Sequence, residues 1–123
     1  MNAVLESERE HERGLGNAPR EVTRQDLGYD IESRPGDGGP LRFIEVKDRP
    51  AGADTVNVTR NEMMVGLNEP DQFILAVVEV DGGEYSIHCV RRPFDRLSGF
   101  GTVVAMLRIP DLLTRAEAHV GGR

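Results

Sequence analysis

Three side chains in this sequence have the types and the spacing to bind a divalent cation and act on a phosphate. Asp30 stands in the segment 28–33, and Glu45 and Lys47 stand two positions apart in the segment 41–47. Carboxylate oxygens suit Mg²⁺, and a lysine amine can orient a water or stabilise negative charge on a phosphate oxygen. Among the fifteen Lys and Arg residues, only Lys47 is lysine. These three are the candidate catalytic residues, with Asp30 and Glu45 as metal ligands.

Two β-strands are expected to position these side chains, with the Gly/Pro-rich segment 34–40 as the turn between them. If the strands pair, Asp30 can approach Glu45, and a bridging cation would relieve the cost of burying both carboxylates. Side chains alternate along a strand. In 41–47 the two faces are Leu41, Phe43, Glu45, Lys47 and Arg42, Ile44, Val46. Both faces carry large apolar residues, which indicates a central strand covered on both sides.

A longer string carries a family resemblance: G-Y-D-I-E-S, then L-R-F-I-E-V-K, then A-G-A-D-T-V-N-V-T-R-N-E. It resembles the NO VEIN C-terminal domain family, a branch of the PD-(D/E)XK, or restriction-endonuclease-like, fold. The resemblance covers residues 12–118 and is strongest over 28–80. It implies an α/β fold with a mixed central β-sheet flanked by helices.

The same resemblance implies a function: a Mg²⁺- or Mn²⁺-dependent endonuclease acting on DNA in bacterial defence or DNA processing. A helicase-like protein or a fused helicase domain is the implied partner. The alternative is a catalytically inactive module of the same fold that binds nucleic acid or protein. The intact Asp30, Glu45 and Lys47 favour the enzyme. The acidic net charge favours the binding module.

Further ligands are carried over from the resemblance. The main-chain carbonyl of Val46 is expected to bind the metal. A glutamate on the first helix, predicted at 3–16, is expected to complete the site, with Glu12 the first choice and Glu8 the second. Relatives have glycine directly after the lysine, whereas this chain has Asp48, a third carboxylate that could tune the metal or weaken the enzyme.

Five polar residues are candidates for nucleic-acid contacts. Arg49 follows the E-V-K motif, and Arg60 and Asn61 open a predicted helix on the side where relatives approach the scissile phosphate. Arg91 and Arg92 stand in an arginine-rich loop that could bind phosphates. The same loop could instead dock on a partner domain or on the acidic surface of this chain.

The rest of the chain continues the alternation of strands and helices. Thr59 and Glu62 have capping-box spacing at the start of a helix, and capping alone accounts for Glu62. The sequence predicts strands near 21–23, 55–58, 72–80, 84–90 and 100–106, loops at 48–54 and 81–83, and helices at 59–68 and 111–119.

The length of the chain favours one domain. The 123 residues suffice for one core, and we expect a single nuclease-like domain over 1–123 whose ends, 1–10 and 119–123, are the segments most prone to disorder. The longest apolar run, 73–78, is too short to cross a membrane. The net charge of −6 argues against tight, autonomous binding to nucleic acid, whose affinity depends on neutralising phosphates.

Cys89 is the only cysteine. It cannot form an internal disulfide, and it fits a reducing compartment, so we expect a cytoplasmic protein. His88 next to Cys89 suggests a zinc site. No second Cys/His pair accompanies it in the sequence, so the spacing argues against zinc.

Overall fold

The chain folds into an α/β domain, seen in a computed structural model that describes residues 2–22, 27–94 and 104–122. In those ranges the helices are α1 (Asn2–Gly14), α2 (Arg60–Asn68) and α3 (Ile109–Leu113). One sheet has the strand order β1-β2-β3-β5-β6-β8, and a second sheet pairs β4 with β7. The strands are β1 (Ala18–Glu21), β2 (Ile31–Arg34), β3 (Arg42–Pro50), β4 (Thr55–Thr59), β5 (Phe73–Asp81), β6 (Glu84–Arg91), β7 (Val104–Arg108) and β8 (Ala116–Gly122).

The larger sheet is mixed. Strands β3 and β5 run parallel, in register from Phe43 opposite Phe73 to Pro50 opposite Val80. The other pairs in this sheet are antiparallel. Parallel neighbours need a crossover connection, and β4 with α2 supplies it. The predicted α/β architecture with a mixed sheet and flanking helices is therefore confirmed.

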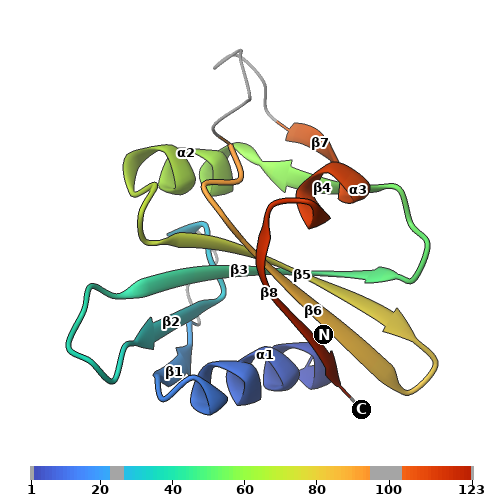
Figure 1. Cartoon of the computed structure of the whole chain (residues 1–123). Coiled ribbons are helices and arrows are strands. Elements are labelled where there is room, and N and C mark those ends of the chain that lie inside the picture. Colours follow the sequence, from blue (N-terminus) through green and yellow to red (C-terminus); the bar gives the residue numbers. More distant parts are fainter. Residues whose placement is uncertain (1, 23–26, 95–103, 123) are drawn as a thin grey trace.

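The sheet is covered on both faces (Figure 1). Helix α1 packs on one face, where Val4 and Leu5 contact a cluster that includes Ile44 and Val46. Helices α2 and α3 and the β4–β7 pair cover the other face, in a cluster that includes Phe73. The predicted alternation along β3 is confirmed, because Ile44 and Val46 face α1 whereas Phe43 packs against the opposite cluster.

The predicted helix at 111–119 is wrong. Helix α3 ends at Leu113, and β8 follows as an edge strand that pairs with β6, with His119 opposite His88. Local propensity in this segment favours a helix, but pairing with the open edge of β6 supplies main-chain hydrogen bonds that propensity cannot anticipate. The predicted strand at 100–106 overlaps β7 only in part, and its first residues lie outside the described ranges.

Several boundaries also differ from the prediction. Strand β2 begins at Ile31, so Asp30 precedes it, and β1 lies at Ala18–Glu21, earlier than expected. Strand β3 continues through Pro50 because β5 offers it a parallel partner over that length, which shortens the predicted loop at 48–54. Helix α1 already begins at Asn2. None of the described helices has the length and apolar character to span a membrane.

Gly66 allows α2 to pack closely on the sheet. A Cβ atom at this position would overlap two ring carbons of Phe94 and would lie 3.1 Å from Phe73 Cδ2. We expect Gly66→Ala to lower the free energy of unfolding by about 1–3 kcal/mol, although alanine normally stabilises a helix relative to glycine. Urea denaturation checks this.

Gly14→Ala is the matched control for that prediction. Gly14 also lies in a helix, but nothing lies within 4 Å of the point that its Cβ atom would occupy, so this variant should be unchanged or more stable. Equal stability of Gly66→Ala and the wild type would contradict the close packing of α2.

Candidate functional site

Asp30 is held just before the start of β2 by contacts with main-chain groups. Gly28 has φ +80°, and a Cβ atom there would lie 2.7 Å from the Asn61 carbonyl oxygen, so the chain passes close to α2 just before Asp30. The Asp30 N–H donates to the carbonyl of Ile44 at 2.8 Å. Its carboxylate Oδ2 accepts from the Val46 N–H at 2.9 Å. Asp30 thus lies beside the middle of β3, although it precedes the residues of β2 that pair with β3.

The carbonyl of Val46 points to the same side as Asp30. Phe43 donates its N–H to Gln72 next to β5, so alternate residues from Phe43 direct their main-chain groups to β5. Val46 has the opposite phase, and its N–H donates to Asp30. Because the N–H and C=O of one strand residue point the same way, the Val46 carbonyl is directed toward the Asp30 side of β3.

Glu45 and Lys47 share the face of β3 that α2 covers. Lys47 Nζ lies 3.2 Å from Glu45 Oε2 and 2.8 Å from Glu62 Oε1. Asp30 lies close to both side chains: its charge raises the pKa of Glu45, and the charge of Lys47 acts to lower the pKa of Asp30. The structure therefore brings together Asp30, Glu45 and Lys47, as the sequence predicted.

Glu62 is a member of this cluster to which the sequence assigned capping alone. The predicted capping box exists: the Glu62 N–H donates to Thr59 Oγ1, and the Thr59 N–H donates to Glu62 Oε1 at 2.9 Å. Glu62 Oε1 also contacts Lys47 Nζ. The capping spacing revealed the position of Glu62 but not its second partner, because the partner depends on how α2 lies on β3.

The cluster holds three carboxylates and one amine away from most solvent. Burial raises the pKa of Glu45 to about 9, and the charges of Asp30 and Glu62 add to this effect. Burial also raises the pKa of Asp30. Burial alone would lower the pKa of Lys47, but its contacts with Glu62 and Glu45 outweigh burial and raise it. At neutral pH the cluster therefore keeps a proton on Glu45 and a charge on Lys47.

Protonation of Glu45 predicts a loss of stability at high pH. The pKa of Glu45 is about 9 in the folded state against 4.5 ordinarily, so the folded state binds more protons between these values and its stability falls as pH rises. When the pH is raised from 6 to 9 in the presence of a metal chelator, the free energy of unfolding of the wild type should fall by roughly 1–3 kcal/mol more than that of Glu45→Gln. Urea denaturation at both pH values measures this, and parallel pH profiles would contradict it.

Glu12 does not join the cluster, which corrects the expectation drawn from the resemblance. It is fully buried on the α1 face of the sheet, opposite the face of Glu45. The Arg42 guanidinium holds it with two hydrogen bonds of 3.0 Å, and Asn17 Nδ2 adds a third. Burial alone would raise the pKa of Glu12, but the contacts with Arg42 lower it. The sheet itself separates Glu12 from Asp30 and Glu45.

The carboxylate of Asp48 lies on the face of β3 opposite Lys47 and Glu45, although the sequence suggested a place near the site. Like Ile44 and Val46, Asp48 lies on the face of β3 that α1 covers. Its side chain is exposed and lines a pocket together with Ala3 and Val4 of α1. Strand alternation places consecutive residues on opposite faces, so proximity in sequence misled the prediction.

The predicted nucleic-acid residues fall in two groups. Arg49, Arg60 and Asn61 are exposed and stand within two residues of Lys47 or Glu62 along the chain. Arg91 and Arg92 are exposed elsewhere and contact Asp71: Arg91 Nη1 donates to its carbonyl at 3.3 Å, and Arg92 pairs with its carboxylate. The first group is thus close to the cluster along the chain, whereas the second group contacts Asp71 in the connection between α2 and β5.

Another group of potential metal ligands lies across the sheet. Within the described ranges, Glu8, His11 and Cys89 place one ligand atom each so that all three lie within 4.8 Å of one another. The sequence pattern suggested only the adjacent His88 as a companion for Cys89 and argued against zinc. The His88 ring instead contacts Glu79 at 2.9 Å, and the histidine near Cys89 comes from α1.

Two comparisons with known proteins bear on this geometry. The family model described as Protein NO VEIN, C-terminal, matches residues 1–90, which include α1, the β2–β3 pair, α2 and nearly all of β6. A search of the curated proteins finds no match. The matched region contains every residue of the Asp30–Glu45–Lys47–Glu62 cluster.

Proposed function

This chain belongs to the NO VEIN C-terminal family, and from that premise we propose that it is a PD-(D/E)XK-type, metal-dependent nuclease-like domain acting on DNA. The observation that carries the proposal is the convergence of Asp30, Glu45 and Lys47 on one side of β3. A mixed sheet that carries Glu45 and Lys47, with Asp30 just before the neighbouring strand and helices on both faces (Figure 1), is compatible with a restriction-endonuclease-like core.

The residues present fit Mg²⁺ or Mn²⁺. Asp30 and Glu45 supply carboxylate oxygens and Val46 a carbonyl directed to the same side, the oxygen donors that such ions prefer. Burial keeps a proton on Glu45, and a divalent cation would take its place, because metal ligands must be deprotonated. All the ligand atoms named here are oxygens, which favours a hard cation over zinc.

Each residue has a defined role in phosphodiester hydrolysis. A bound cation would lower the pKa of a water and neutralise charge on the phosphate. Asp30 and Glu45 would hold the cation, and the Val46 N–H fixes the Asp30 carboxylate. Lys47 orients the attacking water or stabilises negative charge on a phosphate oxygen. Glu62 aims the Lys47 amine, because its own carboxylate is fixed by the N-terminus of α2.

Binding of DNA is proposed to depend on a partner. Arg49 and Arg60, each two positions from a cluster residue along the chain, are exposed cations suited to phosphate contacts. The net charge of −6 opposes tight binding by this chain alone. A helicase-like protein or fused helicase domain that holds the strand would overcome this repulsion.

Metal binding and plasmid nicking together test the proposal. We expect Mg²⁺ or Mn²⁺ to bind the wild type in calorimetry, and Asp30→Asn to abolish both binding and nicking. Asp48→Asn is the matched control: it removes the same charge from β3 on the face away from the cluster, so it should keep both properties.

The outcomes separate the enzyme from the binding module. Binding that depends on Asp30 but produces no nicking, with or without an added helicase, would favour the inactive module. Absence of cation binding in the wild type would overturn the metal-dependent mechanism.

A further inference from the structure

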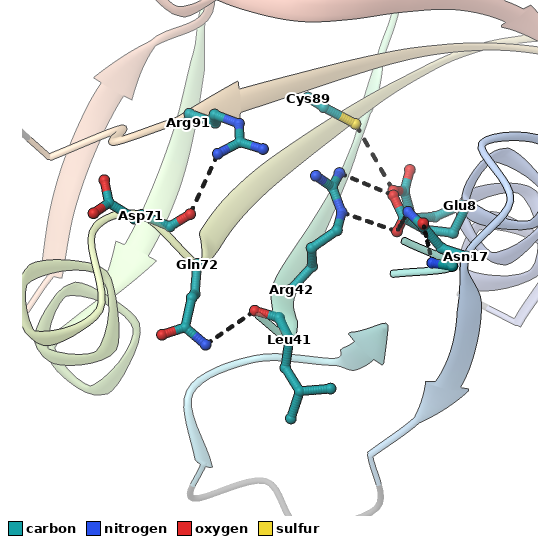
Figure 2. Close-up of polar contacts among 10 residues, drawn as sticks. Glu8, Asn17, Leu41, Arg42, Asp71, Gln72, Cys89 and Arg91 are labelled. Atoms are coloured by element: carbon teal, nitrogen blue, oxygen red, sulfur yellow. Dashed lines mark hydrogen bonds and ion pairs between the residues drawn. The ribbon is translucent and has the colours of Figure 1, made fainter. Parts of the chain in front are cut away.

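A second cluster lies between α1 and β6, on the face of the sheet away from Asp30 and Glu45. Glu8 and His11 are three residues apart on α1, which places their side chains on one face of the helix. Cys89 projects from β6 toward them, and its Sγ lies 3.8 Å from Glu8 Oε1 (Figure 2). The three ligand atoms lie within 4.8 Å of one another.

The donor set and spacing suit a zinc ion. Zinc binds thiolate sulfur, imidazole nitrogen and carboxylate oxygen at about 2.0–2.3 Å, so tetrahedral ligand atoms lie roughly 3.3–3.8 Å apart. The distance from Cys89 Sγ to Glu8 Oε1 is at the upper end of that range. Small side-chain rotations would close the remaining gap to His11, because the atoms already lie within 4.8 Å.

A second observation points to a ligand at this position. Glu8 is fully buried, and its Oε2 atom makes no hydrogen bond with any residue in the described part of the chain. Buried carboxylate oxygens are nearly always paired. Arg42 donates two hydrogen bonds to Glu12, the next glutamate along α1 from Glu10. A cation between Glu8 and Cys89 would satisfy the remaining oxygen.

We propose that Glu8, His11 and Cys89 form a Zn²⁺ site that ties α1 to β6, with a water as the fourth ligand. A thiolate and a carboxylate together neutralise the two charges of the ion, which makes its burial favourable. This site is independent of the proposed nuclease site, because the sheet separates the two clusters.

Cobalt substitution tests the site directly. Co²⁺ should give the wild type the thiolate-to-cobalt absorption of a tetrahedral site, and this absorption should saturate when one Co²⁺ is bound at Cys89. Zn²⁺ should displace it and raise the melting temperature by roughly 5–10 °C at a hundredfold excess over its dissociation constant. Cys89→Ser and His11→Gln should each abolish the absorption and the Zn²⁺-dependent shift in melting temperature.

Two controls make the result specific. Glu10→Gln removes an exposed carboxylate from the same helix and should keep the Co²⁺ spectrum. Asp30→Asn should also keep it, which distinguishes this site from the proposed nuclease site. His11→Gln alters a partly exposed residue, so it remains informative if Cys89→Ser fails to fold. Absence of the thiolate band in the wild type, or a thiolate band that survives both ligand variants, would overturn the proposal.

Discussion

Replacing Arg42 with methionine should lower the free energy of unfolding by about 3–5 kcal/mol, because it leaves Glu12 buried without its cationic partner. Glu12 is fully buried, and only 12% of the Arg42 side chain is exposed. Two parallel hydrogen bonds of 3.0 Å join them. Methionine retains much of the apolar stem, so the loss reports on the charge pair rather than on packing.

Arg20→Met is the control for this effect. Arg20 also makes two hydrogen bonds to one glutamate, Glu32, but 71% of its side chain is exposed. Exposed ion pairs contribute about 0–1 kcal/mol, so Arg20→Met should be close to the wild type in urea denaturation. Similar losses in the two variants would contradict the assignment of the stability to buried charge.

Replacing Lys47 with alanine should reduce DNA cleavage by on the order of 10²–10³-fold, the size typical of removing one electrostatic stabiliser from an active site. Cation binding should survive, because Asp30 and Glu45 remain and the competing positive charge is gone. The prediction follows from the proposed function. The initial rate of plasmid nicking in Mg²⁺ or Mn²⁺ measures cleavage, and calorimetry on the same sample measures cation binding.

Arg108→Ala is the control for charge alone. Arg108 is exposed and contacts Asp111 at 3.9 Å, far along the chain from the cluster. This variant loses one positive charge, as Lys47→Ala does, and should cleave at the wild-type rate. Unchanged cleavage by Lys47→Ala would remove Lys47 from the mechanism, even if the chain binds the cation.

Local patterns in the sequence predicted much of the central sheet. The alternation along 41–47 predicted which side of β3 carries Glu45 and Lys47, because a period of two has only two phases. The Thr59–Glu62 spacing predicted the start of α2, because a capping box depends on neighbouring residues. The convergence of Asp30 with Glu45 followed from pairing of adjacent strands.

Contacts between distant segments could not be predicted in the same way. Whether Glu12 reaches the cluster depends on which face of the sheet α1 covers, and a single helix pattern does not encode that choice. The contact between Glu8 and Cys89 joins residues 81 positions apart. Strand β8 forms because β6 has an open edge, a property of the assembled sheet rather than of the segment 116–122.

Lys47 has one more consequence, which concerns covalent labelling. It is the only lysine in the sequence, so its Nζ is the single side-chain primary amine on which an acylating reagent can act. Such reagents attack the neutral amine, and the contacts with Glu62 and Glu45 that raise the pKa of Lys47 keep that form scarce. The acylation rate at this one atom therefore reports directly on how firmly the carboxylates around it are engaged.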